Sequence, residues 1–334
     1  MEWRQSMGEV MTISCSKVKW AAVLFLLGSH NAIAQNYPAK PLRMIIPFPA
    51  GGTADIIARL VGVKAAERLG QPVIAENRVG AGGTIGSDLV AKAAPDGYTF
   101  LMTTTGSHLL TSLVTKNVPY DPLKDFTPIT GATESYSGLA VAPSLGINSV
   151  RELLDLARRN PGKLTYSSAG IGTAFHLAGA LFGNAGNVEL THVPYKGAGQ
   201  ALNDLMTGTI TMTFSAITSQ LPFLRSGKLK LIAVLGTQRF AALPDIPTMS
   251  EALPNFENLE AMTGFLGPAG MPAPVLGRLN GDLAATVKSA EVRAKLEADG
   301  NTPVGNSPEQ FGAHLQRAYQ AYVRAVKLVN LKPE

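Results

Sequence analysis

Two stretches of small residues could bind an anion through backbone N–H groups alone. The first, PFPAGGTAD, spans residues 47–55, and the second, SSAGIGT, spans residues 167–173. Each follows an apolar strand-like run and opens a helical pattern. Small residues let a ligand approach the backbone closely, and the first N–H groups of a helix have no partner and lie at the positive end of its dipole. The two loops therefore predict an anion site made of backbone rather than of side chains.

The candidate ligand-binding residues belong to these two loops and to neighbouring strand ends. The first loop contributes Phe48, Ala50, Gly51, Gly52, Thr53, Ala54 and Asp55; the second contributes Ser168, Ala169, Gly170, Gly172, Thr173 and His176; other strand ends contribute Thr105, Ser107, Tyr195 and Lys196. Structural roles stay open for several of them. The serines and threonines are also common helix caps, and Asp55 suits any helix start, although it could also receive a ligand ammonium group. His176 could be a structural histidine, and Tyr195–Lys196 a solvated turn.

A small carboxylate fits these loops better than a nucleotide does. A P-loop would end in Gly-Lys-Ser/Thr, which neither loop contains. The segment GAGGTIG at 80–86 comes near the dinucleotide fingerprint, but its third glycine is one place late and no clear ribose-binding acid follows. Dinucleotide binding stays open as an alternative.

Both loops are needed if the ligand is a carboxylate. Removing a carboxylate from water costs several kcal/mol, a hydrogen bond to a charged group returns about 1.5–3 kcal/mol, and micromolar affinity requires about −8 kcal/mol. One loop with two or three N–H groups barely offsets the desolvation. A second loop that closes from another domain supplies the surplus and excludes water, so we expect a ligand-driven hinge closure.

The sequence contains none of the catalytic motifs that would indicate an enzyme. It has no G-x-S-x-G elbow, and its only cysteine is Cys15. Beyond residue 34 the histidines show no metal-ligand spacing; they are His108, His176, His192 and His314. We therefore expect no catalytic residues, no metal and no cofactor. An exported hydrolase with a dispersed active site is the alternative function.

The first 34 residues have the pattern of a secretory signal peptide. Lys17 and Lys19 form a basic region, residues 20–27 form an apolar run too short to cross a bilayer, and Ala-Ile-Ala at 32–34 fits a small-x-small cleavage site. We expect cleavage near Ala34. The leader carries three of the 29 Lys and Arg residues and two of the 24 Asp and Glu residues, so the mature chain has a net charge of +4. It has no Lys/Arg run suited to nucleic acid.

Strand-like and helical patterns alternate along the rest of the chain, which predicts an α/β fold with parallel sheets. The first strands are expected at 42–47, 71–77 and 98–105, and a helix is expected within residues 148–162, with Ser149 and Glu152 spaced as a capping box at its start and Pro161–Gly162 at its end. A second β/α series begins near residue 137, and a late strand at 261–270 precedes helices at about 272–288, 290–299 and 308–328.

The late strand suggests that the chain returns to its first domain. We predict two doubly wound domains with a ligand cleft between them. Domain 1 comprises residues 35–133 and 258–334, and domain 2 comprises residues 134–257. One large α/β domain is the alternative.

A set of motifs resembles the Bug family, the extracytoplasmic solute receptors of tripartite tricarboxylate transporters. The motifs are PFPAGGTAD, ENRVGAGGTIGSDLVAKAAPDGYT, YDPLKDFTPI, SSAGIGTAFHLAG, VPYKGAGQALNDLMTG and PDIPTMSE, in this order over nearly all of the mature chain. The resemblance implies a type II periplasmic-binding-protein fold whose cleft closes on a small organic carboxylate. It also implies that Phe48, Gly52, Ala54, Asp55 and residues 168–173 face this ligand.

By the same resemblance the chain works in the periplasm, where we expect a monomer that passes its ligand to membrane transporter subunits or to a sensor kinase. Two places depart from the family pattern. Met262 and Thr263 stand where many relatives carry a tryptophan, and Ser215 and Thr218 stand where an acidic or amide residue is common. Ser215 joins the candidate ligand contacts, and the loss of an acid there makes an amino-acid ligand less expected.

Overall fold

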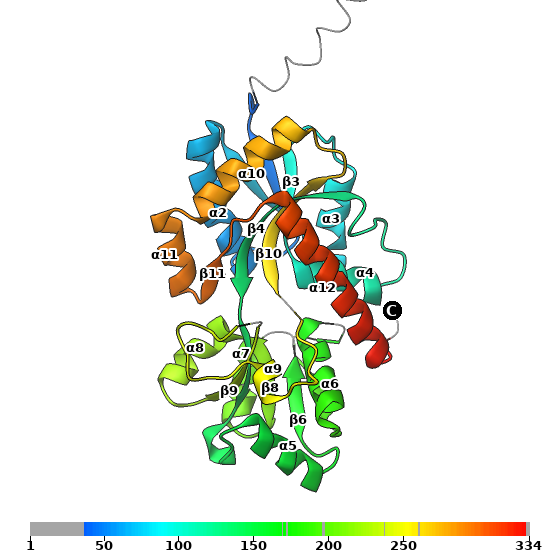
Figure 1. The fold of residues 1–334 in the computed structure, drawn as a ribbon, viewed down its shortest axis with the longest axis vertical. Helices are drawn as coiled ribbons and strands as arrows, with labels where there is room; N and C mark the ends of the chain where they lie inside the picture. Colours follow the sequence, from blue (N-terminus) through cyan, green and yellow to red (C-terminus); the bar gives the residue numbers. More distant parts are fainter. Residues whose placement is uncertain are drawn as a thin grey trace, which may run out of the picture.

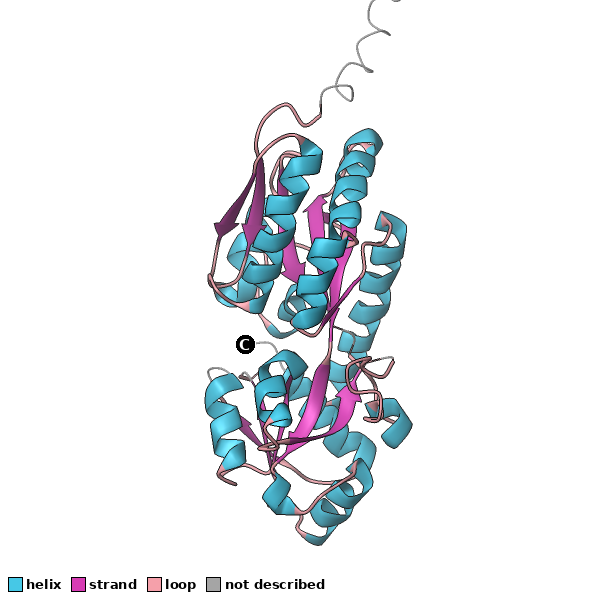
Figure 2. Ribbon diagram, turned by 90° about the vertical axis from the view of Figure 1, so that its left-hand side faces the viewer, coloured by secondary structure: helices cyan, strands magenta, loops and turns pink. Residues whose placement is uncertain are grey.

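The computed structural model describes residues 37–331 apart from 169, 172, 196, 197, 237 and 260, and these residues form two lobes, each built on one sheet (Figure 1). Helices pack on both faces of the sheets (Figure 2). The expected signal peptide lies outside the described residues. In the described part of the chain, no helix is both long and apolar enough to span a membrane.

The six-stranded lobe has the strand order β11-β4-β10-β3-β1-β2. Its strands are β1 (Leu42–Ile46), β2 (Val73–Asn77), β3 (Thr99–Thr104), β4 (Phe126–Ser135), β10 (Met262–Pro268) and β11 (Asn301–Pro303). Its helices are α2 (Thr53–Leu69), η1 (Ala81–Gly83), α3 (Thr84–Ala91), α4 (Thr105–Val114), α10 (Ala273–Val287), α11 (Ala290–Ala298) and α12 (Pro308–Leu328).

β1 is buried on both faces because helices cover both sides of the sheet. Met44 and Ile46 belong to the core formed with α2 and α10, whereas Ile45 belongs to the core formed with α3, α4 and α12. This division follows from the alternation of side chains along a strand. The neighbours β2 and β3 pair with β1 in parallel, so the chain leaves β1 and β3 at the same edge of the sheet and enters α2 and α4 there.

The five-stranded lobe has the strand order β7-β6-β8-β5-β9. Its strands are β5 (Ser137–Val141), β6 (Thr165–Ser168), β7 (Thr191–Pro194), β8 (Met212–Ala216) and β9 (Lys230–Leu235). Its helices are η2 (Pro143–Leu145), α5 (Val150–Arg159), α6 (Ala174–Gly186), α7 (Ala198–Met206), α8 (Ile217–Arg225) and α9 (Met249–Ala252).

The expected capping box of α5 is only half formed. The side chain of Ser149 accepts a hydrogen bond from the backbone N–H of Glu152, as predicted. The carboxylate of Glu152, however, accepts from the backbone N–H of Asn148, one residue earlier than in a capping box.

Both sheets are mixed, so the prediction of parallel sheets is wrong for three strands. β10 runs antiparallel to β3 and β4, β11 runs antiparallel to β4, and β5 runs antiparallel to β8 and β9. A parallel neighbour requires a crossover connection. β5 instead follows β4 after the single residue Tyr136, and β10 enters its sheet directly from the other lobe. The late strand and the three helices after it are confirmed at their predicted places.

Two segments connect the lobes: Tyr136, between β4 and β5, and the stretch from α9 to β10. The predicted domain boundaries after residues 133 and 257 stay a prediction. Beside these segments, α4 and α12 of the six-stranded lobe contact α6 of the five-stranded lobe. One hydrophobic core therefore continues from lobe to lobe through these helices.

Candidate functional site

A cavity of about 690 Å³ lies between the two lobes, with residues of both lobes in its wall. It is bounded on one side by the loop after β1 and on the other by the starts of α6 and α8. The predicted site residues that line it are Phe48, Thr53, Ala54, Ser107 and Thr173. The structure therefore brings parts of both predicted loops to one cavity.

Among the described residues, five helices begin at the cavity wall, three from the six-stranded lobe and two from the five-stranded lobe. The residues at these starts, N-caps included, are Thr53 and Ala54 of α2, Gly83 of α3, Gly106 and Ser107 of α4, Thr173 and Ala174 of α6, and Ala216 and Thr218 of α8. None of the described residues in the wall is Asp, Glu, Lys, Arg or His. The positive ends of five helix dipoles thus lie at a cavity in which the described residues place no charged side chain, and this arrangement favours an anion.

The start of α2 has open donors. Its N-cap is Gly52, which has no side chain to accept from the helix. The backbone N–H groups of Thr53, Ala54 and Asp55 donate to no atom of the described residues, and the next N–H, of Ile56, bonds to Gly52 O. Two of these N–H groups, those of Thr53 and Ala54, belong to residues of the cavity wall and are available to a ligand acceptor.

Asp55 holds this loop instead of lining the cavity. Its side chain is buried, and its oxygens accept from the backbone N–H of Gly51 at 2.9 Å, from Nδ2 of Asn77 at 2.8 Å and from Nε of Arg59 at 3.0 Å. Burial raises the pKa of Asp55, but the hydrogen bonds from Arg59, Gly51 and Asn77 outweigh it and lower this pKa to about 2. The carboxylate is therefore ionised at neutral pH and occupied within its own loop.

Ala50, Gly51 and Gly52 form the exposed part of the same loop, and they do not belong to the cavity wall. Gly51 has φ = 80°, a conformation in the left-handed region that favours glycine. These three residues form the turn that leads from β1 into α2.

In the second loop, the polar side chains also bond locally. Oγ of Ser168 accepts from the backbone N–H of Gly170 at 3.1 Å and lies 2.7 Å from Nε2 of His192. Oγ1 of Thr173 donates to Gly170 O at 2.7 Å and accepts from the backbone N–H of His176. Ala169 and Gly172 lie outside the described residues. Thr173 reaches the cavity wall, whereas Ser168 and Gly170 shape the loop behind it.

His176 stacks on His192, with ring centroids 4.2 Å apart. Burial lowers the pKa of both rings, and the neighbouring His176 contributes further to bring that of His192 to about 4. Both rings are therefore neutral at neutral pH. His176 lies outside the cavity wall, which agrees with the structural alternative for this residue.

Three further predicted residues, Thr105, Tyr195 and Ser215, do not line the cavity. Oγ1 of Thr105 accepts from the backbone N–H of Met262 at 3.0 Å. Tyr195 donates its hydroxyl to Asp204 at 2.6 Å, and burial together with this carboxylate raises its pKa to about 12. Ser215 is buried and accepts from Nε2 of Gln220 at 2.9 Å. Lys196 lies outside the described residues.

The sequence prediction missed several parts of the wall, and two of these lie at or just before helix starts. One is the start of α8, at Ala216 and Thr218, which directly follows the end of β8. The other is the glycine loop before α3, whose Gly82 O accepts from Oγ of Ser107 and Oγ1 of Thr111. Both follow strand ends, so the rule that ligands bind beyond the carboxyl ends of parallel strands could have found them.

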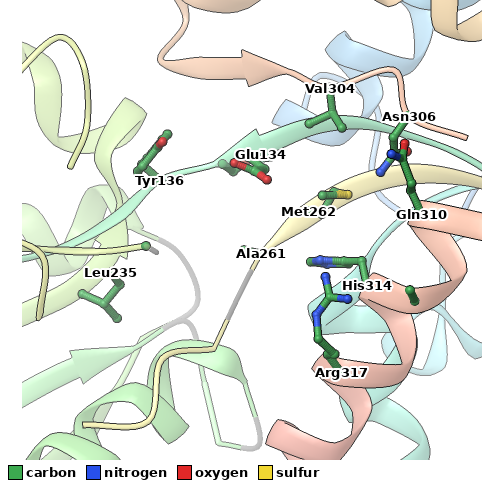
Figure 3. A pocket seen from close by; sticks show the side chains of 13 residues that line it. Glu134, Tyr136, Leu235, Ala261, Met262, Val304, Asn306, Gln310, His314 and Arg317 are labelled. Carbon is green, nitrogen blue, oxygen red and sulfur yellow. The ribbon is translucent and has the colours of Figure 1, made fainter. Parts of the chain in front are cut away.

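A second cavity, of about 530 Å³, lies behind the connection between the lobes (Figure 3). Met262 lines this rear cavity, whereas Thr263, the next residue of β10, lines the main one. Neighbouring residues of a strand point to opposite faces, so the two cavities lie on opposite sides of β10. Four residues line both and separate them: Ser135, Tyr136, Leu235 and Ala261.

The chain matches a family model described as "Tripartite tricarboxylate transporter family receptor" over residues 57–331. Among solved structures it is similar to the periplasmic binding protein BugD, with 31% identity and a TM-score of 0.74 over 89% of this chain and all of BugD. It is also similar to Rpa4515 of R. palustris with adipate, with 33% identity and a TM-score of 0.77 over 89% of this chain and 100% of that one.

A third similar structure is MatC of Rhodopseudomonas palustris with bound malate, with 31% identity and a TM-score of 0.72 over 88% of this chain and 100% of that one. The family model covers most of the chain, and the structures cover nearly all of the two lobes. These proteins bind and deliver solutes and are not enzymes, so the hydrolase alternative is set aside. The chain belongs to the tripartite tricarboxylate transporter receptors, the Bug family of periplasmic solute-binding proteins.

Proposed function

We propose that this protein captures a small organic carboxylate in the cavity between its lobes and delivers it to the membrane subunits of a tripartite tricarboxylate transporter. The observation that carries the proposal is that Thr53 and Ala54, whose backbone N–H groups are open, line the same cavity as the starts of α6 and α8 of the other lobe. Adipate and malate in the related structures are both carboxylates.

The energetics require donors from both lobes. Desolvating a carboxylate costs several kcal/mol, and each hydrogen bond to it returns about 1.5–3 kcal/mol. Hydrogen bonds from α2 alone barely offset this desolvation, whereas bonds from α6 or α8 added by closure bring the binding free energy to the −8 kcal/mol of micromolar affinity. Closure would occur about the two connecting segments, between a domain of residues 35–133 and 258–334 and one of residues 134–257.

Delivery follows from the same closure. Ligand in the cavity brings the two lobes together, so the outer surface of the closed protein differs from that of the open one. A membrane partner, either the transporter subunits or a sensor kinase, can bind the closed form in preference to the open form. We expect the exported protein to do this as a monomer in the periplasm after cleavage near Ala34.

Isothermal titration of the purified protein with a panel of organic acids and neutral sugars tests the proposal. At least one acid should bind with micromolar or tighter affinity, and at one hundred times its Kd it should stabilise the fold by about 2.7 kcal/mol. Sugars should leave the melting temperature unchanged. Binding of a sugar with no response to any acid would overturn the proposal.

A further inference from the structure

We propose that the rear cavity is a second ligand site and that it binds a small zwitterion, a molecule with one carboxylate and one ammonium group joined by a short alkyl chain. The inference goes beyond the proposed function, which concerns the main cavity alone. It rests on the polar groups that two walls of the rear cavity present and on the opposite charges of these walls.

One wall of the rear cavity is formed by the ends of β4 and β10. Glu134 of β4 pairs directly with Met262 of β10, so the two side chains leave the sheet on the same face. Both residues line the rear cavity and not the main one. Glu134 is exposed, and it forms no ion pair with another described residue. This sheet wall therefore presents a carboxylate that can bind a cationic group.

The opposite wall is one face of α12. Gln310, His314 and Arg317 follow one another at spacings of four and three residues, which places them on the same side of the helix. Figure 3 shows His314 and Arg317 side by side on the helix, with Glu134 on the strand opposite. Arg317 is exposed and forms no ion pair within the described part of the chain. The helix wall thus presents a guanidinium that can bind an anionic group.

Two amide side chains add donors to the helix wall. Oδ1 of Asn306 accepts from the backbone N–H of Gly131 at 2.8 Å, and Oε1 of Gln310 accepts from the backbone N–H of Ser307 at 3.1 Å. Both oxygens are therefore engaged, and the NH₂ group of each amide donates to no atom of the described residues. Asn306 and Gln310 line the rear cavity beside Arg317. Two amide donors and a guanidinium form a suitable set for a carboxylate.

The two charges together select a zwitterion. Glu134 and Arg317 line one cavity without forming an ion pair with each other. A ligand with only a carboxylate would be repelled by Glu134, and a ligand with only an ammonium group would be repelled by Arg317. A zwitterion interacts favourably with both. Met262 and Val304 of the same cavity can pack on its alkyl chain, and a volume of about 530 Å³ is typical of a small-molecule site.

Isothermal titration of the Gly52→Val protein with aminoalkanoates tests the inference. Valine at the N-cap of α2 obstructs the N–H groups of the main cavity and lies outside the rear one. The probes are glycine, 4-aminobutanoate and 6-aminohexanoate, each compared with the acid that lacks its ammonium group and the amine that lacks its carboxylate. At least one aminoalkanoate should have a Kd at least tenfold lower than those of both analogues. If none does, the inference is overturned.

Two variants in the same background locate the binding. Arg317→Gln and Glu134→Gln should each raise the Kd of the best aminoalkanoate at least tenfold. Glu134→Gln should also lower the Kd of its matched acid, because the repulsion is removed. Both variants should keep the melting temperature of the parent, since neither side chain has an ion pair to lose.

Arg151→Gln on α5 and Glu297→Gln on α11 are the matched controls, because both residues are exposed and lie outside both cavities. Neither control should change the Kd of the aminoalkanoate. An aminoalkanoate whose Kd is the same in Arg317→Gln and Glu134→Gln as in the controls binds elsewhere, and this result would also overturn the inference.

Discussion

Gly51 donates its backbone N–H to Oδ2 of Asp55 at 2.9 Å, and this bond ties the exposed turn of the first loop to the helix that follows it. Asn77, at the end of β2, completes the arrangement by donating through Nδ2 both to Oδ1 of Asp55 and to Phe48 O. The loop is thus held from inside by one carboxylate and one amide. The backbone N–H groups of Thr53 and Ala54, at the start of α2, have no acceptor among the described residues.

Asp55→Asn should weaken both the fold and the binding. The new amide nitrogen cannot accept from Gly51 or Arg59, and hydrogen bonds to a charged group contribute about 1.5–3 kcal/mol. We expect a loss of about 1–3 kcal/mol in the free energy of unfolding, measured by urea denaturation, and weaker binding of the best acid of the panel. Asp155→Asn is the control, because Asp155 forms a surface pair with Arg158. Equal effects of the two variants would contradict the role given to Asp55.

Gly51 and Gly52 should respond to substitution in opposite ways. Gly52 has φ = −75°, and a Cβ there would meet only Pro49 O at 3.4 Å, so Gly52→Val should fold normally. Its side chain would obstruct the N–H groups of α2 and raise the Kd at least tenfold. Gly51→Ala should instead cost stability, about 1 kcal/mol, because φ = 80° is strained for alanine. Normal ligand binding by Gly52→Val would show that the loop is misassigned.

His108 should make the protein less stable in mild acid. The ring is 1% exposed, and its Nε2 lies 2.9 Å from Pro122 O, which accepts from it. Burial lowers the pKa of His108 to about 4, against a smaller opposite effect of Pro122 O. In the unfolded chain the pKa is about 6.5, so between these values the unfolded state binds more protons. The stabilising contribution of the neutral His108 ring to the free energy of unfolding is therefore complete above pH 6.5, and it is lost as the pH falls towards 4.

Urea denaturation from pH 7 to pH 4 measures this effect. His108→Gln keeps a donor for Pro122 O and removes the titration, so its free energy of unfolding should depend less on pH than that of the parent protein. His176 and His192, whose pKa values are also lowered, keep part of the slope in both proteins. Parallel curves for parent and variant would contradict the assignment to His108.

Sequence patterns within short stretches of the chain were sufficient to predict β1, the loop after it and α2, which form one side of the site. The apolar run of β1, the glycines after it and the periodicity of α2 all depend on residues close in sequence, and the structure places them as expected. β4 has no counterpart among the predicted strands, because Pro128 and Gly131 are unfavourable in strands and only its pairing with β10 and β11 compensates for them.

The Asp55 carboxylate holds its own loop instead of contacting a ligand. This role depends on residues distant in the sequence and could not be predicted from the loop alone. A carboxylate at the third position of a helix is compatible with a ligand contact, a dipole partner or a loop anchor. What decides among these is Asn77, which is 22 residues away and reaches Asp55 because β2 lies beside β1. Likewise, the antiparallel direction of β10 depends on where the chain re-enters the six-stranded lobe, and no local sequence pattern predicts this point.

The position of β10 between the two cavities gives a last prediction, about the hinge. When the lobes rotate about the connecting segments to close the main cavity, the walls of the rear cavity must move apart, because it lies on the other side of the same segments. A bulky side chain in the rear cavity should therefore favour the closed state. Ala313 is suited to this test, since it lines the rear cavity and is exposed on α12.

Ala313→Trp should lower the Kd of the best acid of the panel by about three- to tenfold, because the closed state is more populated before binding. A readout without ligand is the distance between spin labels at Val63→Cys on α2 and Arg151→Cys on α5, which should shift towards that of the liganded protein. Ala294→Trp, an exposed helical alanine outside both cavities, is the matched control. Unchanged affinity and unchanged label distance in Ala313→Trp would mean that the rear cavity does not widen on closure, and that the axis of closure lies elsewhere.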